Sequence, residues 1–257
     1  MKERDIIVEK VLYAELTPQE FRDRIKASPI AYLPLGTLEW HGEHLPLGAD
    51  GIQSQGFFVE LAKKAGGIVL PMLFMGPDRR IEGENGVLYG MDPWTGEREA
   101  GKKIREPGQL DGSAYWLPDE SFLDLIECIL IQLKRAKFKI VVAHGHGPST
   151  GLVAAHAKEW EEKYKLKIVN CWGSEYDGEG MGIQVDHAGA NETSLVMALR
   201  PDLVQMDRLS ENPGDFPAGV GGKDPRVYAG ADLGKKIIEL QSERMAKILG
   251  ALRDAKI

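Results

Sequence analysis

Residues 30–50 read IAYLPLGTLEWHGEHLPLGAD, an apolar run that leads directly into a polar segment rich in glycine. The run Ile30–Leu35 is bounded by proline and glycine, which predicts a short buried strand. A second apolar run, Lys139–Ala143, leads in the same way into AHGHGPSTG at 143–151. In open α/β sheets, ligands bind beyond the carboxyl ends of the strands. Both polar segments are therefore candidate sites.

Helices and strands alternate along the rest of the chain. A capping box with proline in the first turn, Thr17-Pro18-Gln19-Glu20, predicts a helix over 18–27. Hydrophobic periodicity and helix breakers predict further helices over 52–64, 119–136, 151–164, 191–199 and 231–255, and further strands over 68–70 and 166–171. This alternation predicts an α/β fold with a mainly parallel sheet. Since the sequence shows no linker, we expect a single domain over 1–257, with a long irregular excursion at 76–118.

The composition is acidic and otherwise ordinary. The chain has 257 residues, of which 32 are Lys or Arg and 39 are Asp or Glu, for a net charge of −7. Nucleic acids and anionic membranes need a basic surface, so neither is expected as a partner. The sequence contains no signal peptide and no apolar run of spanning length, so we expect a cytoplasmic protein. Cys128 and Cys171 form no disulfide or zinc pattern, and Cys128, in an apolar helical run, is expected in the core.

Five of the six histidines fall in three polar clusters, which is the strongest functional feature of the sequence. In the first cluster, Glu39 and His41 are two residues apart, so in extended backbone their side chains point the same way. Asp50 follows across a segment rich in glycine and proline. Carboxylate with imidazole is a ligand mixture that suits zinc, manganese or iron. A solvated polar loop explains the same residues equally well, so this cluster alone leaves both interpretations open.

The other two clusters also leave alternatives. His144 and His146 lie among glycines, which allow the backbone to approach a ligand. A metal site there competes with a phosphate-binding loop and with a tight strand-to-helix turn. His187 precedes an expected helix, where it can cap the helix, bind metal or act as acid and base. Glu192 falls in the first turn of that helix and is either a ligand or a residue favoured by the helix dipole.

Taken together, the clusters resemble the creatininase (creatinine amidohydrolase) family. The family's first motif is matched by PLGTLEWHGEHLP at 34–46, followed by Asp50, and its third by HAGANETS at 187–194. The second motif departs, because HGHGPS at 144–149 keeps the Gly-His-Gly core but lacks both asparagines and one glycine. The match spans residues 30–200. It implies a three-layer α/β/α sandwich with a mainly parallel sheet, assembled as a homo-oligomer for which the family precedent is a hexamer.

The resemblance also implies a site for two divalent metal ions, with zinc, manganese and iron all open. Its metal-ligand positions correspond to Glu39, His41, Asp50, His146 and Glu192. Asp50 is the natural bridge, since one carboxylate can give an oxygen to each ion. The implied activity is hydrolysis of a non-peptide C–N bond in a small-molecule amide, cyclic amide or formamide, by a hydroxide that two metals activate. His187 matches a histidine assigned to proton transfer or substrate binding, and we expect it to titrate in the range needed to protonate the leaving nitrogen.

Substrate selection is expected to come from the excursion, where the candidates are Arg79, Arg80, Trp94, Arg105, Tyr115 and Trp116. Local packing explains the aromatic residues equally well. Creatinine is not the favoured substrate, because the excursion is unlike the family's usual short connection. Three alternatives stay open: a peptide-trimming member of the family, a catalytically inactive protein on the same fold that binds metal or a small molecule, and an amidohydrolase on a (β/α)₈ barrel. The barrel is disfavoured by the length of the chain and by the late position of His144-Gly-His146.

Overall fold

The computed structural model describes residues 10–83, 86–92, 103–104 and 112–255. Within these residues, four strands form a parallel sheet in the order β2-β1-β6-β7. Their bounds are β1 Ile30–Leu35, β2 Ile68–Val69, β6 Ile140–Gly145 and β7 Lys167–Val169. The two central strands, β1 and β6, pair in register from Ile30 opposite Ile140 to Leu35 opposite Gly145. Their carboxyl ends therefore lie side by side.

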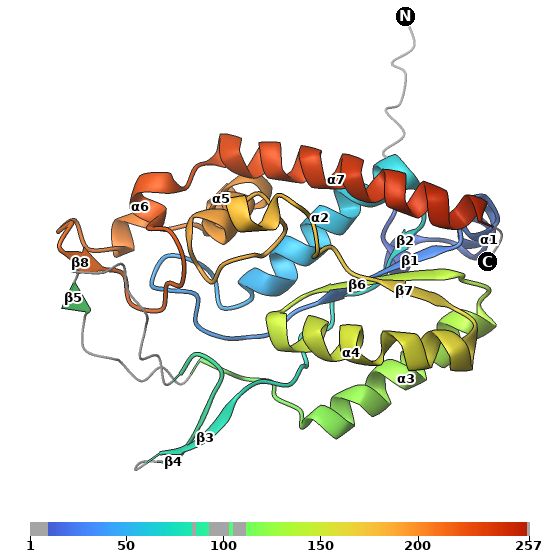
Figure 1. Cartoon of the computed structure of the whole chain (residues 1–257), viewed down its shortest axis with the longest axis horizontal. Helices are drawn as coiled ribbons and strands as arrows, with labels where there is room; N and C mark the ends of the chain where they lie inside the picture. The colour runs from blue at the N-terminus through green and yellow to red at the C-terminus, as the bar shows by residue number, and fades with distance from the viewer. Residues whose placement is uncertain (1–9, 84–85, 93–102, 105–111, 256–257) are drawn as a thin grey trace, which may run out of the picture.

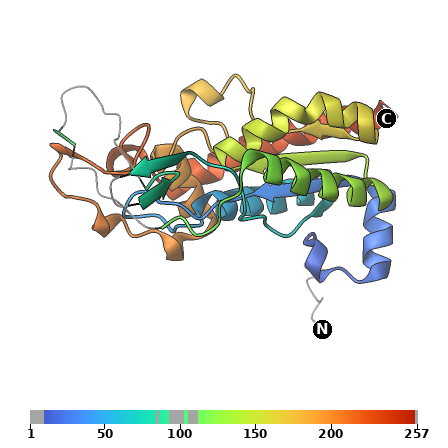
Figure 2. The same ribbon diagram turned by 90° about the horizontal axis from the view of Figure 1, so that it is seen from below.

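Helices cover both faces of this sheet (Figures 1 and 2). One layer consists of α2 (Ala49–Ala65), α5 (Ala190–Leu199) and α7 (Ala231–Asp254), which contact one another. The other layer consists of α3 (Asp119–Arg135) and α4 (Gly147–Tyr164), which also pack together. The predicted three-layer α/β/α sandwich with a mainly parallel sheet is confirmed.

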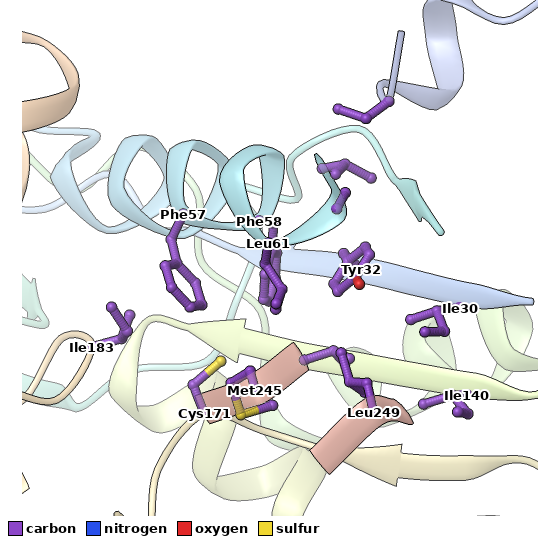
Figure 3. Packing of buried hydrophobic residues seen from close by; sticks show 14 of the residues in the cluster. Ile30, Tyr32, Phe57, Phe58, Leu61, Ile140, Cys171, Ile183, Met245 and Leu249 are labelled. Carbon is purple, nitrogen blue, oxygen red and sulfur yellow. The ribbon is translucent and has the colours of Figure 1, made fainter. Parts of the chain in front are cut away.

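The hydrophobic cores on the two faces of the sheet follow from the alternation of side chains along the strands. Ile30 and Tyr32 of β1 face the α2 and α7 layer, where they join Phe57, Phe58 and residues of α7 (Figure 3). Ala31, Leu33 and Leu35 point to the opposite face and pack with residues of α3 and α4. Because successive strand residues point to opposite faces, a strand covered on both sides must be apolar throughout. Every residue of β1 and β6 is accordingly buried.

Smaller elements complete the described part of the chain. Helix α1 (Pro18–Ala27) packs at the edge of the second core, and the predicted capping box at Thr17 is present. Short elements are α6 (Pro225–Tyr228) and the 3-10 helices η1 (Tyr13–Glu15), η2 (Asp177–Glu179), η3 (Pro201–Leu203) and η4 (Met206–Arg208). In the described residues, no helix combines the length and the apolar character needed to cross a bilayer.

The excursion at 76–118 is less irregular than expected. It contains an antiparallel hairpin of β3 (Arg80–Gly83) and β4 (Gly86–Tyr89), and β5 (Lys103–Ile104), which pairs in parallel with β8 (Asp215–Phe216). Since these strands are short and carry no clear alternation of polar and apolar residues, periodicity could not reveal them.

Two further expectations are corrected. Helix α4 begins at Gly147, four residues earlier than predicted. Pro148 suits the first turn of a helix, because the backbone N–H groups there have no partner within the helix and proline has no such group. Cys128 is exposed and Cys171 is buried, so the expectation that Cys128 belongs to the core is wrong. Cys128 comes two residues after the buried Ile126, about 200° around the helix, and therefore faces away from the core.

Candidate metal centre

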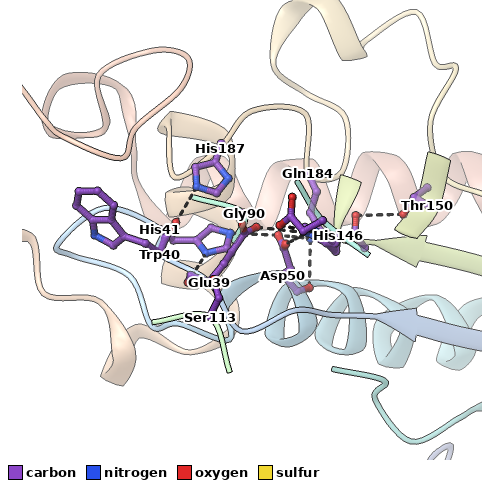
Figure 4. Close-up of polar contacts among 12 residues, drawn as sticks. Glu39, Trp40, His41, Asp50, Gly90, Ser113, His146, Thr150, Gln184 and His187 are labelled. Atoms are coloured by element: carbon purple, nitrogen blue, oxygen red, sulfur yellow. Dashed lines mark hydrogen bonds and ion pairs between the residues drawn. The ribbon is translucent and has the colours of Figure 1, made fainter. Parts of the chain in front are cut away.

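The candidate ligands meet at the carboxyl ends of the two central strands. Glu39 and His41 lie in the loop that follows β1, and Asp50 lies in the first turn of α2. His146 is the residue that joins β6 to α4, and Glu192 lies in the first turn of α5. Because β1 and β6 are neighbours, their loops emerge at the same edge of the sheet. The structure thus brings together all five predicted ligand residues, of which Figure 4 labels Glu39, His41, Asp50 and His146.

Asp50 is the centre of this cluster. Its Oδ1 atom lies 3.3 Å from Nε2 of His41, and its Oδ2 atom lies 2.9 Å from Nδ1 of His146. Nδ1 of His146 is also 3.3 Å from Oε1 of Glu39, and Nε2 of His41 is 3.7 Å from Oε2 of Glu192. All five side chains are at most 5% exposed. One carboxylate therefore presents one oxygen to each of two buried histidines.

Backbone carbonyl groups orient the imidazole rings. Nδ1 of His41 lies 3.2 Å from the carbonyl oxygen of Glu39, and since a carbonyl only accepts, Nδ1 carries the proton and donates it. In the same way, Nε2 of His187 donates to the carbonyl oxygen of Trp40 at 2.9 Å. The His187 ring stacks on His41 with 4.3 Å between ring centroids, so it borders the cluster. The loop after β1 thus fixes which nitrogen of each ring serves the site.

Neighbouring carboxylates hold the pKa values of the two central histidines high. Burial disfavours the protonated form of His41, but Asp50 and Glu192 outweigh burial and raise the pKa to about 10. Burial is likewise outweighed at His146 by Asp50 and Glu39, which raise its pKa well above the ordinary value. Burial would raise the pKa of Asp50, but the two histidines hold it well below its usual value. With no cation bound, both histidines are therefore protonated at neutral pH.

The pKa values of Glu192 and His187 are shifted in the directions that favour their neutral forms. Burial and the nearby charge of Asp50 raise the pKa of Glu192 well above its ordinary value. Burial and the charge of His41 lower the pKa of His187 to about 4. This differs from the expectation that His187 titrates near neutral pH, because its ring is enclosed against a charged histidine. At pH 7, His187 is a neutral imidazole.

The donor set fits divalent cations. Three overlapping groups have ligand atoms within 4.8 Å of one another: Glu39 with His41 and His187, Glu39 with Asp78 and His146, and His41 with Asp50 and Glu192. A cation bound at about 2.0–2.2 Å from nitrogen and oxygen holds its donors within about 4.4 Å of one another, slightly closer than this limit. Mixed imidazole and carboxylate donors suit zinc, manganese and iron.

Two residues near the cluster were not predicted. Asp78, in the excursion, has its Oδ2 atom 3.5 Å from Nε2 of His146, and burial and Glu39 raise its pKa to about 7. Gln184 donates from Nε2 to Oδ1 of Asp50 at 3.2 Å, and its Oε1 atom has no hydrogen-bond partner among the described residues. Neither position carries a motif or periodicity, so only the folded chain identifies them.

The residues of the excursion that were expected to select the substrate differ in where they lie and what they contact. Trp94 and Arg105 lie outside the described residues. Trp116 donates from Nε1 to the carbonyl oxygen of Asp78 at 3.0 Å, and Arg79 donates from Nη2 to that of Gly90 at 3.1 Å. These two side chains hold the loop together, which favours the packing interpretation for them. Arg80 pairs with the exposed Glu82, and Tyr115 is itself exposed.

The other histidines, and Ser149 of the second motif, lie outside the cluster of candidate ligands. His44 contacts Oγ1 of Thr193 through Nε2 at 2.8 Å, which ties the loop after β1 to α5. His144 donates from Nε2 to the carbonyl oxygen of Ile183 at 3.1 Å and does not join the cluster. Oγ of Ser149 is buried without a hydrogen-bond partner in the described part of the chain. His156 is partly buried on α4, where it stacks on Trp160.

Comparison with known proteins identifies a family whose model matches most of the chain. A family model described as creatininase, creatinine amidohydrolase, matches residues 14–249. The creatinine amidohydrolase of Pseudomonas putida is 25% identical over 224 residues, which cover 79% of this chain and 77% of that protein. The mycofactocin precursor peptide peptidase of Mycolicibacterium smegmatis is 29% identical over 187 residues, which cover 70% of this chain and 62% of that protein.

Solved structures show the same fold. A structure named Creatininase Mn has a TM-score of 0.70 at 21% identity and covers 94% of this chain and 98% of its own. A mutant creatininase described as the Zn-Zn type has a TM-score of 0.69 at 19% identity and covers 94% of this chain and 97% of its own. At this identity, the similarity establishes the architecture.

Proposed function

Since the chain belongs to the creatininase family, we propose that it is a metal-dependent amidohydrolase that cleaves a C–N bond of a small molecule. The substrate class is an amide, cyclic amide or formamide. The family is hydrolytic, and similar structures include manganese and zinc forms. One observation carries the proposal: Glu39, His41, Asp50, His146 and Glu192, from three distant parts of the sequence, converge around the carboxylate of Asp50.

We assign the five side chains to two divalent cations. His41 and Glu192 lie on the Oδ1 side of Asp50, while Glu39 and His146 lie on the Oδ2 side. A bridging carboxylate needs this arrangement, with one oxygen for each cation. The proton of His41 is fixed on Nδ1 by the carbonyl group of Glu39, which leaves Nε2 as the ligand nitrogen. Bound cations would supply a Lewis acid for the substrate carbonyl and a water molecule whose pKa is lowered toward 7.

His187 is the proposed proton-transfer residue. Its Nε2–H is donated to Trp40, so Nδ1 is the nitrogen that exchanges a proton. Because burial keeps the ring neutral at pH 7, Nδ1 is ready to accept a proton from the attacking water. The same atom then returns the proton to the leaving nitrogen. His187 therefore acts as base first and as acid second.

Turnover of a substrate panel tests the proposal. The protein loaded with manganese, zinc or iron is assayed on cyclic amides, formamides and linear amides, beside chelator-treated protein and the Asp50→Ala variant. We expect hydrolysis of one of these classes, lost on chelation and in Asp50→Ala. Full activity without metal contradicts the mechanism. Retention of metal without turnover of any amide supports the inactive binding protein instead.

A peptide-trimming activity is the second candidate. The observation that favours it is the 29% identity to a peptide peptidase over 70% of the chain. Short peptides belong in the same panel, because release of a terminal residue with no turnover of small amides identifies this alternative. The metal site itself is expected to be the same in both cases.

Three further predictions accompany this function. We treat 1–257 as one hydrolase domain, since the proposed ligands come from both halves of the sequence. Assembly as a homo-oligomer, with six copies as the precedent, is checked by size-exclusion chromatography with light scattering. The cytoplasmic location predicted from the sequence is checked by fractionation of cells that express the protein.

A further inference from the structure

Asp78 connects the excursion to the metal centre. It is the only acidic residue of the described excursion whose side chain the structure places within 4 Å of a candidate ligand, with Oδ2 3.5 Å from Nε2 of His146. Its side chain is 16% exposed, against 3% for His146 and 5% for Glu39. Asp78 therefore lies at the outer boundary of the buried cluster.

The surrounding chain fixes the position of Asp78. The backbone N–H of Arg79 donates to Oδ1 at 2.7 Å. Oδ2 lies 3.5 Å from Nε2 of His146, the nitrogen that also donates to the carbonyl oxygen of Pro77 at 3.2 Å, while Glu39 faces Nδ1 of the same ring. The carbonyl oxygen of Asp78 accepts a hydrogen bond from Trp116 at 3.0 Å. Gly90 is held beside this segment by hydrogen bonds in both directions with Arg79. The carboxylate is therefore positioned by a folded hairpin.

Gly90, which has no side chain, lies against two carboxylate oxygens. A Cβ atom at this position would lie 2.5 Å from Oδ2 of Asp78 and 2.9 Å from Oε2 of Glu39. Two carboxylate oxygens that face the same space repel each other unless a cation or a proton lies between them. Ligand atoms of Glu39, Asp78 and His146 all lie within 4.8 Å of one another, and donors around a single cation lie within about 4.4 Å, so a small closure of this group would hold one cation.

Charge balance of the whole centre favours a further carboxylate. Glu39, Asp50 and Glu192 supply three carboxylates, with Asp50 shared between the two sides, and two divalent cations carry four positive charges. Asp78 supplies the fourth carboxylate, and burial favours a centre whose charges are matched.

We infer that Asp78 is a sixth ligand residue of the metal centre and completes the half formed by Glu39 and His146. This inference rests on the proposed function. It gives the excursion a role in holding a cation. It also predicts that the two cations respond differently to changes in the excursion.

Metal titration of the full chain tests the role of Asp78 without an activity assay. Metal-free wild type, Asp78→Asn and Glu82→Gln are titrated with Mn²⁺ by calorimetry, and bound metal is counted after desalting. Glu82→Gln is the matched control, because Glu82 lies on the same hairpin with an exposed side chain. Thermal unfolding of the metal-free variants checks that the fold is intact.

The expected result is two Mn²⁺ per chain in wild type and in Glu82→Gln. In Asp78→Asn, one Mn²⁺ keeps its affinity and the other binds at least about tenfold more weakly. An Asp78→Asn isotherm that overlays that of wild type overturns the assignment and leaves the proposed function standing. A wild-type chain that binds neither Mn²⁺ nor Zn²⁺ overturns both.

Discussion

Cation binding should release protons from the buried cluster around Asp50. His41 has a pKa of about 10 and the pKa of His146 is well above its ordinary value, so both carry a proton at pH 7. The pKa of Glu192 is also raised well above its usual value. A metal ligand must present a lone pair, so each of these groups has to give up its proton before it can coordinate.

The size of this release follows from the number of protonated ligands. One proton from each of His41 and His146 amounts to about two protons for two cations at pH 7, and the raised pKa of Glu192 adds to that number. Because protons and cations compete, the affinity rises with pH. The overall binding constant for two cations should fall by about two orders of magnitude or more for each pH unit below 7.

Calorimetry measures the release directly. Mn²⁺ is titrated into metal-free protein at pH 7 in buffers that differ in ionisation enthalpy, and the slope of the observed enthalpy gives the number of protons. Glu192→Gln, which has no carboxyl proton to lose, should release fewer protons than wild type. The control His156→Gln, on α4 outside the cluster, should match wild type. If the wild type releases less than one proton, the hypothesis that the ligand side chains are protonated before cations bind is wrong.

Other predictions concern catalysis, backbone geometry and thiol exposure. His187→Gln should lower kcat by about 10²–10⁴-fold while two cations stay bound, as steady-state kinetics and metal counting will show; an unchanged kcat removes His187 from the mechanism. Gly145→Ala should lower the free energy of unfolding in urea by about 3 kcal/mol or more, because Gly145 has a φ of 147° and a Cβ would lie 1.7 Å from the carbonyl oxygen of Leu35. In the native protein, a thiol reagent should modify the exposed Cys128 and leave Cys171 unmodified until the chain unfolds; equal labelling rates contradict the placement of α3.

Local chemistry explains what could be predicted from the sequence. The capping box works within four residues: the backbone N–H of Glu20 donates to Oγ1 of Thr17, and that of Thr17 donates to Oε2 of Glu20 at 2.7 Å. The central strands were recognisable because a strand covered on both faces has to be apolar throughout. Glu39 and His146 could be placed at one edge of the sheet, since both follow such strands directly.

The remainder of the site depends on contacts that no local pattern encodes. Asp78 reaches His146 only because a hairpin turns the excursion back toward the sheet, although the two residues are 68 positions apart in the sequence. Gln184 approaches Asp50 across a still longer separation. The exposure of Cys128 could have been predicted from its position around the helix, on the side opposite Ile126. The prediction was wrong because it relied on the apolar residues next to Cys128 in the sequence.

The two outer strands of the sheet have a consequence for self-association. β2 has two residues and is flanked by Val11, whose carbonyl oxygen accepts the N–H of Val69 at 2.9 Å; β7 has three residues. Growth of a sheet from one molecule into the next requires a long row of unsatisfied backbone groups. Among the described residues, neither margin of the four-stranded sheet offers such a row, so the short outer strands disfavour edge-to-edge growth of this sheet from one molecule into the next.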